Sequence, residues 1–384
     1  MIGFRPSRYV ILSQIWGITL MIALSSHVPS AADSAQNGPG TPTPHKDKEF
    51  TEFFRRSSGW TAGDGALSVA LSDGRVLWLF GDSHLDDIDP KTGTMPCLFQ
   101  ARNAGLMQQI SDPGNVRTLL GEGPVFHSWL KNSEDGAKEW FWPLCGFQNE
   151  HTLWIYLSAL RKTEAGGPFG FESIGHDYWA KIHLPEFEPK TYVALPDFNG
   201  ITFGNGLIVE GRYVYAFGGK QRGLASDVYV ARFNPRRPES DWVFWDGKSW
   251  SPNVKKAAAI AYGRSNSIHV CKIKESFLLT TTEFSVGCDQ GKQIFMAKSQ
   301  KPTGPFGPLK SIFTIDDSYQ GHLPFFYFAV AHPEFINAAG ELLVTYSINN
   351  YEPCVTNCVN GRAIPDHYRP KAIRVPLKAI DVAW

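Results

Sequence analysis

The stretch VLWLFGD (Val76–Asp82) is the first of five similar apolar segments in this chain. The other four follow at intervals of about 60 to 75 residues and read TLWIYLS (Thr152–Ser158), YVYAFGG (Tyr213–Gly219), SFLLTTTE (Ser276–Glu283) and ELLVTYSI (Glu341–Ile348). A repeat that contains several strands per unit is typical of a β-propeller, in which each repeat forms one blade. The sequence therefore predicts an all-β fold, a five-bladed β-propeller of four-stranded antiparallel blades.

Turn residues separate the strands of each repeat. Ser72-Asp73-Gly74 comes shortly before the first copy, and Glu210-Gly211 comes shortly before the third. Asp-Gly between β-rich segments is a strong hairpin signal. Only a short tail follows Leu377, so we expect Glu49–Arg56 to supply the outer strand of the last blade and close the ring.

Composition and charge limit the classes of partner. The chain has 384 residues, of which 43% are hydrophobic, and its 37 Lys and Arg balance its 37 Asp and Glu. No basic run or stripe is present, so we expect no nucleic-acid partner.

The N-terminus has the layout of a secretory signal peptide. Arg5 and Arg8 precede an apolar run, Val10–Leu24, and the small residues Ser30-Ala31-Ala32 follow. The run is shorter than the roughly 20 residues that a membrane span needs, and an uncleaved anchor is the alternative. We therefore predict a signal peptide at 1–32, a flexible linker at 33–49 and the propeller at 50–384. This predicts a secreted or periplasmic protein with no membrane span in the mature chain.

Six cysteines are consistent with disulfides in an exported chain. Cys271 and Cys288 flank one expected hairpin. Cys354 and Cys358 are close enough in sequence to bond, which would leave Cys97 with Cys145. The number of cysteines allows many connectivities, so these pairings remain hypotheses. A zinc site is the alternative, but paired CxxC motifs are lacking.

Two acids stand at the same register of the repeat. Counting eight residues from each turn reaches Asp82 and Glu283, whereas the other copies have Ser158, Gly219 and Ile348. An acid at the end of an apolar strand is disfavoured by burial and by strand propensity, and such violations often mark functional sites. Polar side chains near the starts of the preceding strands add Asp64 and Glu334 as candidate acids.

Candidate substrate-binding side chains lie near the same strand ends or close to the acids. They are Trp60, Arg102, Asn103, Trp142, Asn205, Asn266 and His332. The aromatic rings could stack on sugar faces, and the polar groups could hydrogen-bond hydroxyls.

The turn decides how Asp64 and Asp82 face each other. If Ser72-Asp73-Gly74 is a three-residue loop, the two acids lie directly opposite on one face of the sheet. If Asp73-Gly74 is a two-residue turn, they point to opposite faces unless a bulge intervenes. Two adjacent carboxylates would raise the pKa of one of them, as an acid–base pair requires.

These features resemble the five-bladed propeller glycoside hydrolases, which include arabinanases and levansucrase-like furanosidases. LWLFGDSHL (Leu77–Leu85), ARNAG (Ala101–Gly105), HPEF (His332–Phe335) and YSINN (Tyr346–Asn350) are similar to bacterial propellers of unknown function that include D-arabinan-cleaving enzymes. The resemblance covers roughly residues 58–377 in architecture.

The resemblance implies a secreted glycoside hydrolase that acts on a furanose-containing or other extracellular polysaccharide. Asp64 matches a blade 1 acid that is a nucleophile or base in such enzymes, and Asp82 matches the acid of a GDS motif. The chain departs from the better-known furanosidases, because Trp142 and Asn205 stand where blades 2 and 3 would supply acids. Any further acid would then come from Glu283, Glu334 or Glu150, or the two blade 1 acids would suffice.

The same sequence features allow other interpretations besides a glycoside hydrolase. Asp86, Asp87 and Asp89 form an acidic loop, for which solvation is favoured over a structural calcium site; no cofactor is expected. A sialidase would need repeated Asp-boxes, and FWDGKSW (Phe244–Trp250) is a single partial match. The alternative from another class is a non-catalytic, lectin-like or surface-binding propeller. A lectin would repeat its pocket residues in each blade, whereas here they differ, which favours one asymmetric enzymatic site with a carbohydrate substrate.

Overall fold

The computed structural model describes residues 42–121, 127–131, 138–163, 170–188, 190–285, 287–349 and 355–384. Residues 41–384 form one compact unit. The predicted signal peptide, most of the predicted linker, Asn350 and Cys354 lie outside the described residues. No helix within the described ranges is long and apolar enough to cross a membrane.

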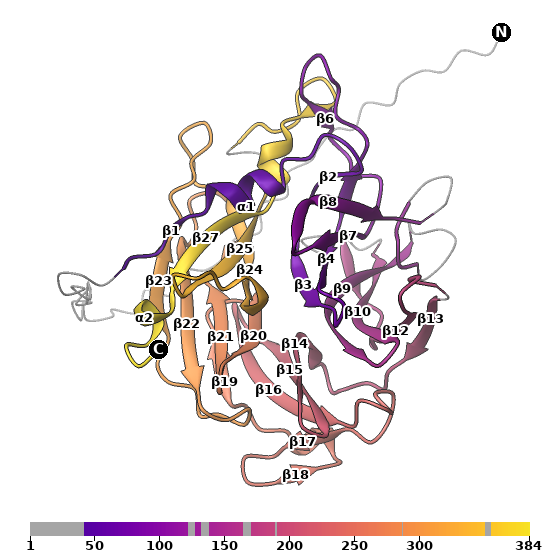
Figure 1. The fold of residues 1–384 in the computed structure, drawn as a ribbon, viewed down its shortest axis with the longest axis vertical. Coiled ribbons are helices and arrows are strands. Elements are labelled where there is room, and N and C mark those ends of the chain that lie inside the picture. Colours follow the sequence, from indigo (N-terminus) through magenta and orange to yellow (C-terminus); the bar gives the residue numbers. More distant parts are fainter. Residues whose placement is uncertain are drawn as a thin grey trace, which may run out of the picture. The chain divides into compact units, whose positions relative to one another are not determined.

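Five antiparallel sheets follow one another along the chain as the blades of a five-bladed β-propeller, as predicted (Figure 1). Blade 1 contains β3 (Leu67–Ala70), β4 (Arg75–Phe80), β7 (Ala104–Gln109) and β8 (Asp112–Leu119). Blade 2 contains β9 (Glu139–Asn149), β10 (Thr152–Lys162), β12 (Tyr178–His183) and β13 (Lys190–Ala194), with β11 (Phe171–Ser173) paired to β10.

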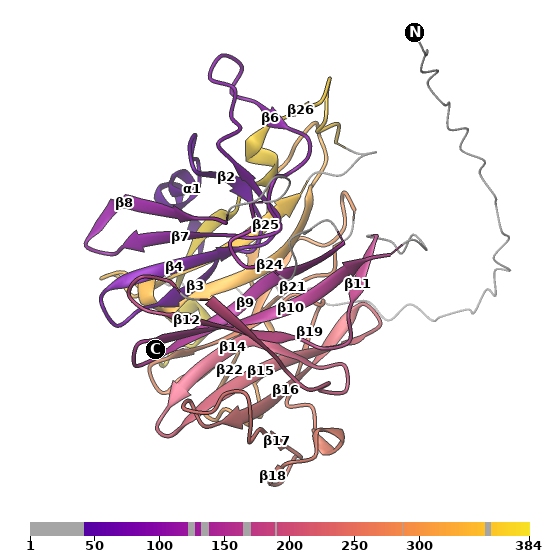
Figure 2. The same cartoon turned by 90° about the vertical axis from the view of Figure 1, so that its right-hand side faces the viewer.

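Blade 3 is the largest, and Figure 2 shows it from a second side. It contains β14 (Thr202–Glu210), β15 (Tyr213–Arg222), β16 (Ala225–Phe233), β17 (Val243–Trp245), β18 (Trp250–Ser251) and β19 (Ala261–Gly263). Blade 4 contains β20 (Ile268–Ile273), β21 (Ser276–Thr282), β22 (Gln293–Ser299) and β23 (Lys310–Thr314). Blade 5 contains β24 (Phe325–His332), β25 (Glu341–Asn349), β27 (Lys371–Pro376) and β1 (His45–Lys46).

Short elements complete the described fold. Two small sheets pair β2 (Trp60–Gly63) with β5 (Ser83–Leu85) and β6 (Met95–Pro96) with β26 (Arg362–Ala363). The helices are α1 (Lys48–Phe53), α2 (Leu377–Ile380), η1 (Val254–Lys256), η2 (Pro333–Phe335) and η3 (Pro365–Tyr368).

Apolar side chains are buried mainly between neighbouring blades. Leu79 of blade 1 and Leu157 of blade 2 belong to one cluster, and Trp78 of blade 1 belongs to another with Leu343 of blade 5. Similar clusters join blades 2 and 3, 3 and 4, and 4 and 5. Each blade therefore buries both faces against its neighbours, which explains why the recurring segments are almost wholly apolar.

The chain's N-terminal segment closes the ring, but the predicted strand was misplaced. β1 supplies the outer strand and pairs with β27, whereas most of Glu49–Arg56 forms α1 and the turn after it. Asp47 ends the strand and caps the helix by accepting a hydrogen bond from Phe50 N at 2.9 Å. A side-chain cap stabilises a helix start and stops the extended chain at this residue. The folded unit thus extends into the predicted linker.

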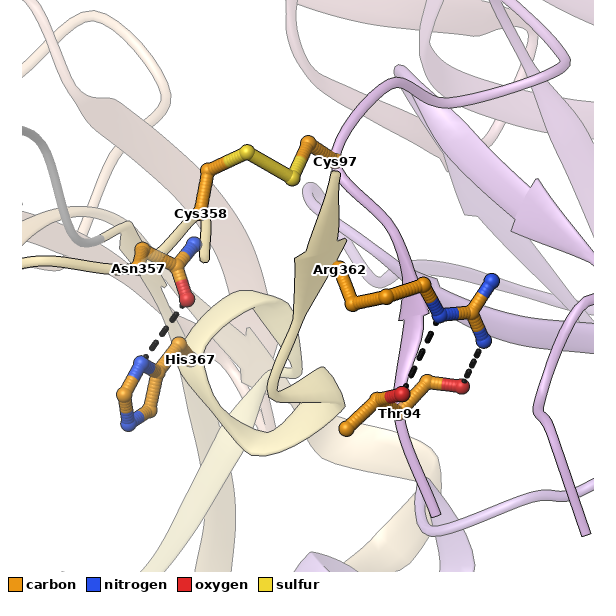
Figure 3. Close-up of a disulfide and its surroundings, with 6 residues drawn as sticks. All are labelled: Thr94, Cys97, Asn357, Cys358, Arg362 and His367. Atoms are coloured by element: carbon orange, nitrogen blue, oxygen red, sulfur yellow. Dashed lines mark hydrogen bonds between the residues drawn. A yellow bond between two sulfur atoms is a disulfide. The ribbon is translucent and has the colours of Figure 1, made fainter. Parts of the chain in front are cut away.

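The disulfide pairings also differ from those expected. Cys97 is bonded to Cys358, 261 residues away, so the loops beyond β6 and before β26 are joined covalently (Figure 3). Cys145 and Cys271 are free and buried, and Cys288 is disulfide-bonded. The hypothetical pairings Cys97–Cys145, Cys354–Cys358 and Cys271–Cys288 are therefore wrong. Sequence proximity misled the prediction, because ring closure brings the two ends of the chain together.

Closure of the ring should depend on Asp47. Its carboxylate accepts a hydrogen bond from Arg374 Nε at 2.6 Å, and the two side chains are only 7% and 12% exposed. Replacing Asp47 with Ala removes the helix cap and leaves a largely buried guanidinium without its anion. We expect a loss of about 2 to 4 kcal/mol in the free energy of unfolding, measured by denaturant titration. Glu49→Ala, an exposed change in the same helix, should cost under about 0.5 kcal/mol; equal losses would contradict this role.

Candidate active site

Asp64 and Asp82 lie in facing chain segments whose register agrees with the three-residue loop. Pairs on either side keep one register, because Gly63 pairs with Ser83 and Leu67 pairs with Leu79. Between these pairs the strands are interrupted, and the two acids occupy the gap between the small β2–β5 sheet and blade 1.

Gly81 sets the space between the two acids. A Cβ atom at this position would lie 2.5 Å from Asp64 Oδ1, well inside van der Waals contact. The Gly81 N–H donates to the Asp64 carbonyl at 2.8 Å, which holds the two chain segments together. The Asp64 carboxylate therefore rests on the backbone directly before Asp82, where a side chain at position 81 would force it to move.

Asp82 accepts hydrogen bonds from two predicted site residues. Trp142 Nε1 donates to Oδ1 at 3.1 Å, and Arg102 Nη1 lies 3.4 Å from Oδ2. The Arg102 guanidinium stacks on the Trp140 ring at 3.9 Å, which fixes its position. The side chains of Asp82 and Arg102 are 13% and 16% exposed. Arg102 therefore pairs with one of the two blade 1 acids, Asp82.

Asp64 is held by two tyrosines that the sequence reading missed. The Tyr327 hydroxyl donates to Asp64 Oδ2 at 2.5 Å. Burial raises the pKa of Asp64 to about 6, although hydrogen bonds from Tyr327 and Tyr368 oppose the rise. Tyr327 lies on the inner strand of blade 5 and Tyr368 at the end of η3. The only sequence signal for Tyr327 was its place in an aromatic run, FFYF (Phe325–Phe328).

The pKa of Asp82 depends on its burial and on two charged neighbours. Burial raises the pKa of Asp82 to about 7; Arg102 opposes the rise and the neighbouring Asp64 adds to it. Desolvation and a nearby like charge both disfavour the ionised form. Near neutral pH the Asp82 carboxyl therefore holds its proton more firmly than the Asp64 carboxyl does.

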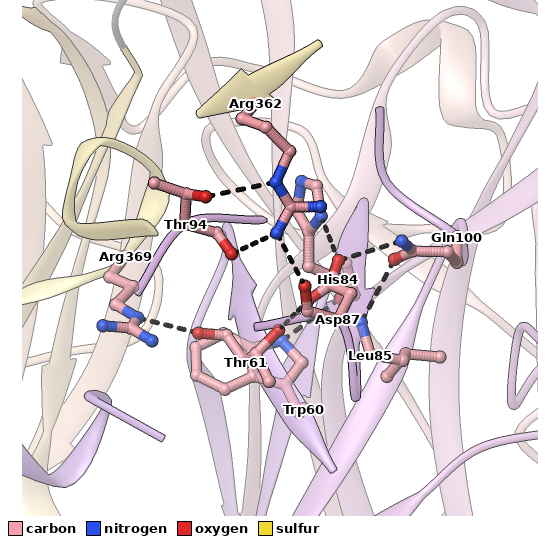
Figure 4. A network of polar contacts seen from close by, with 10 residues as sticks. Trp60, Thr61, His84, Leu85, Asp87, Thr94, Gln100, Arg362 and Arg369 are labelled. Carbon is pink, nitrogen blue, oxygen red and sulfur yellow. Dashed lines mark hydrogen bonds and ion pairs between the residues drawn. The ribbon is translucent and has the colours of Figure 1, made fainter. Parts of the chain in front are cut away.

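A polar network secures the strands just beyond the acids (Figure 4). Asp87 accepts hydrogen bonds from Thr61 Oγ1 on β2 and from Gln100 Nε2 at 2.7 and 2.9 Å, and it pairs with His84 of β5 at 2.7 Å. Burial raises the pKa of Asp87, but hydrogen bonds from His84 and Thr61 outweigh it and leave the pKa below its ordinary value. The ionised Asp87 carboxylate thus links β2 to β5.

The rest of the acidic loop is also engaged in the protein. Asp86 Oδ1 accepts from Gly59 N at 2.6 Å, and Asp89 Oδ1 accepts from Lys91 N at 2.8 Å. Within the described ranges, no group of three or more His, Cys, Asp or Glu side chains is arranged to hold a metal ion.

Three predicted binding residues are buried in the protein instead. Trp60 is fully buried, stacks on Phe80 at 4.1 Å and cannot offer a face to a sugar in this conformation. Asn103 is fully buried, and its amide hydrogen-bonds the backbone of Leu130 and Phe141. His332 is fully buried between Ser68 and Thr345. These side chains support the fold around the acids and do not line a pocket for substrate.

Glu283 has a structural role in a loop, unlike Asp64 and Asp82. Glu283 Oε2 accepts backbone hydrogen bonds from Lys292 at 2.6 Å and Gln293 at 3.1 Å, so the carboxylate closes the loop between β21 and β22. Asn205 is half-buried and donates to the Thr202 carbonyl at 3.1 Å. Asn266 is exposed and accepts from Ser226 Oγ at 3.1 Å.

Glu334 lies at the other ends of the inner strands. It lines a cavity of about 600 Å³ with residues from the later parts of β3, β9, β14 and β20, and neither Asp64 nor Asp82 is among the lining residues. The sequence analysis placed His332 and Glu334 near the start of the inner strand of blade 5. That strand begins at Phe325, and η2 lengthens the connection after it. The grouping of Glu334 with the two aspartates is therefore wrong.

Comparisons with known proteins agree with the fold. A family model described as a domain of unknown function, DUF5005, matches residues 47–381. A solved structure from Bacteroides ovatus, whose description proposes a hydrolase, is 20% identical, with a TM-score of 0.68, and the match covers 88% of this chain and 92% of that one. A search of curated proteins gave no match.

Two further solved structures show weaker similarity. An exo-β-1,3-galactanase from Phanerochaete chrysosporium has a TM-score of 0.46 at 10% identity, over 84% of this chain and 63% of that one. An α-L-arabinofuranosidase of family GH62 from Coprinopsis cinerea has a TM-score of 0.40 at 12% identity, over 84% and 92%.

The raised pKa of Asp82 predicts how the stability of the fold changes with pH. The folded state binds more protons than the unfolded state between about pH 4 and 7, so the contribution of Asp82 to stability falls as pH rises through about 7. Asp82→Asn removes the buried charge. It should raise the melting temperature by roughly 2–6 °C at pH 8.5 and change it little at pH 4. Scanning calorimetry at both pH values measures this, and an unchanged melting temperature at pH 8.5 would contradict it.

Proposed function

This chain belongs to the DUF5005 family, and we propose that it is a glycoside hydrolase in which Asp64 and Asp82 act on a furanose-containing or other extracellular polysaccharide. The observation that carries the proposal is the pair of opposed, largely buried carboxyl groups with raised pKa values. Glycoside hydrolysis requires two carboxyl groups that flank the scissile bond, one of them protonated. Other features of the site support this chemistry.

The surroundings of the two acids favour different roles. Asp82 has the higher pKa, about 7, and holds the proton that a leaving-group oxygen needs. Asp64 has a pKa of about 6 and receives hydrogen bonds from two phenols, which favour its ionised form. We assign Asp82 as the general acid and Asp64 as the base or nucleophile.

Side chains close to Asp82 suit a carbohydrate. Trp142 is half-buried and packs edge to face against Phe171 at 4.8 Å, so this part of the site is aromatic and partly open. Arg102 adds a cation within reach of hydroxyl oxygens next to the proposed acid. Aromatic rings offer apolar faces to sugars, and a guanidinium offers several hydrogen-bond donors.

The preference for furanose polymers and the extracellular location rest on the sequence. The motifs around Asp82 and Arg102 resemble propellers that include D-arabinan-cleaving enzymes, and the N-terminus has a signal-peptide pattern. The Cys97–Cys358 disulfide is consistent with export, since such bonds persist in oxidising compartments.

Single replacements of the acids test the activity. Asp64→Asn and Asp82→Asn should each reduce the release of reducing ends from D-arabinan or a related furanan by at least about 100-fold, because each removes one essential carboxyl group. Glu283→Gln is the matched control and should retain most activity, since that carboxylate caps a loop. Unchanged cleavage in both aspartate variants would overturn the proposal. A lectin-like propeller would bind the glycan and release no reducing ends in any form.

The pH dependence tests the assignment of roles. The productive form has Asp64 ionised and Asp82 protonated. Activity should therefore fall below about pH 6 as Asp64 gains a proton, and above about pH 7 as Asp82 loses one. We expect a narrow bell-shaped profile of kcat/KM for glycan cleavage. A profile that stays flat from pH 5 to 9 would contradict the assignment.

A further inference from the structure

A β-bulge in the inner strand of blade 5 determines where Tyr327 points. Tyr327 pairs with Ser347, but Val330 pairs with Thr345, so two residues of β24 oppose the single Tyr346 of β25. Phe328, in the bulge, has a φ of 55°, in the left-handed region that a bulky side chain rarely adopts. Such bulges redirect side chains and are frequent beside active sites.

The extra residue changes the face on which Tyr327 lies. In a regular strand, alternation would place Tyr327 on the face of Ala329 and Ala331, which are buried in the core between blades 4 and 5. With the bulge, Tyr327 shares a face with Val330 and His332, which contact blade 1. Its hydroxyl reaches Asp64 only because of this shift.

The Tyr327 ring is held from its side as well. It stacks on Phe325 with ring centroids 4.6 Å apart and an interplanar angle of 20°. Its hydroxyl donates to Asp64 Oδ2, while Oδ1 of the same carboxylate rests against Gly81. The carboxylate is thus confined between a phenol on one side and a backbone segment on the other.

We propose that Tyr327 is a positioning residue for the reaction, and that the bulge at Phe328 and Ala329 directs its hydroxyl to hold the Asp64 carboxylate in its working orientation. The inference rests on the proposed function, in which Asp64 is the base or nucleophile. Holding a reacting group rigidly in place increases the reaction rate greatly, and a displacement of about 1 Å can lower the rate about 100-fold.

The same hydrogen bond also affects the titration of Asp64. The hydroxyls of Tyr327 from blade 5 and Tyr368 from η3 act on its carboxyl, and the charge of Asp64 in turn acts on Asp82, which pairs with Arg102. A phenol that donates to a carboxylate favours the charged form. Removing the Tyr327 hydroxyl should therefore raise the pKa of Asp64.

Tyr327→Phe provides the test, because it deletes the hydroxyl and keeps the ring that stacks on Phe325. We expect kcat for glycan cleavage to fall about 10- to 100-fold with little change in KM, and the acidic limb of the pH profile to move to higher pH. Tyr262→Phe is the matched control, since that side chain is 58% exposed on β19, and it should leave both unchanged. A fall in kcat with an unmoved acidic limb would overturn the proposal.

A second measurement separates this proposal from the proposed function. The Asp64 carboxyl carbon is titrated by ¹³C NMR in the protein and in Tyr327→Phe, with Asp64→Asn to assign the signal. An equal pKa of Asp64 in both proteins overturns the positioning role even if glycans are cleaved. A raised pKa in the variant supports the contact independently of activity, while the absence of cleavage by the unaltered protein counts against the glycosidase alone.

Discussion

The closure of blade 5 against blade 1 is the contact on which the site depends. Asp64 and its support come from blade 1, whereas Tyr327, His332 and Ser347 come from blade 5. Tyr327 donates to Asp64, Ser68 hydrogen-bonds His332 at 2.6 Å, and Gly65 N donates to Ser347 Oγ at 3.0 Å. A propeller whose ring failed to close would separate these partners and leave buried polar groups unsatisfied, which is costly.

The site combines a stable frame with two unfavourably buried acids. Burial raises both pKa values, the charge of Asp64 adds to the rise for Asp82, and the two buried acids cost stability near neutral pH. The frame around them consists of the Asp87 network, the Asp47–Arg374 pair and the Cys97–Cys358 disulfide. Such an arrangement is common at catalytic sites, where reactive side chains that destabilise the fold are held in place by surrounding residues that stabilise it.

Local sequence patterns predicted the features that depend on interactions between residues close in sequence, namely the strands and the turns. The five apolar segments predicted the blades because each strand is buried on both faces. Ser72-Asp73-Gly74 predicted the register in which the segments of Asp64 and Asp82 face each other. The prediction failed where packing overrides a local pattern. Trp60 looked like a sugar platform but fills a core, and Glu334 was grouped with the aspartates because η2 lengthens one connection.

The sequence alone thus determined the all-β propeller and the number of blades, because strand period and turn chemistry act over a few residues, and it singled out the two acids of blade 1 as candidates. Only the tertiary structure decided which segments close the ring, which cysteines bond and which side chains surround the acids. Tyr327 is the clearest case, since a single extra residue in β24 selects the face on which its ring lies, and no periodic pattern records that residue. These features depend on contacts between residues more than 250 positions apart, such as Asp64 and Tyr327, and local sequence carries no measure of that proximity.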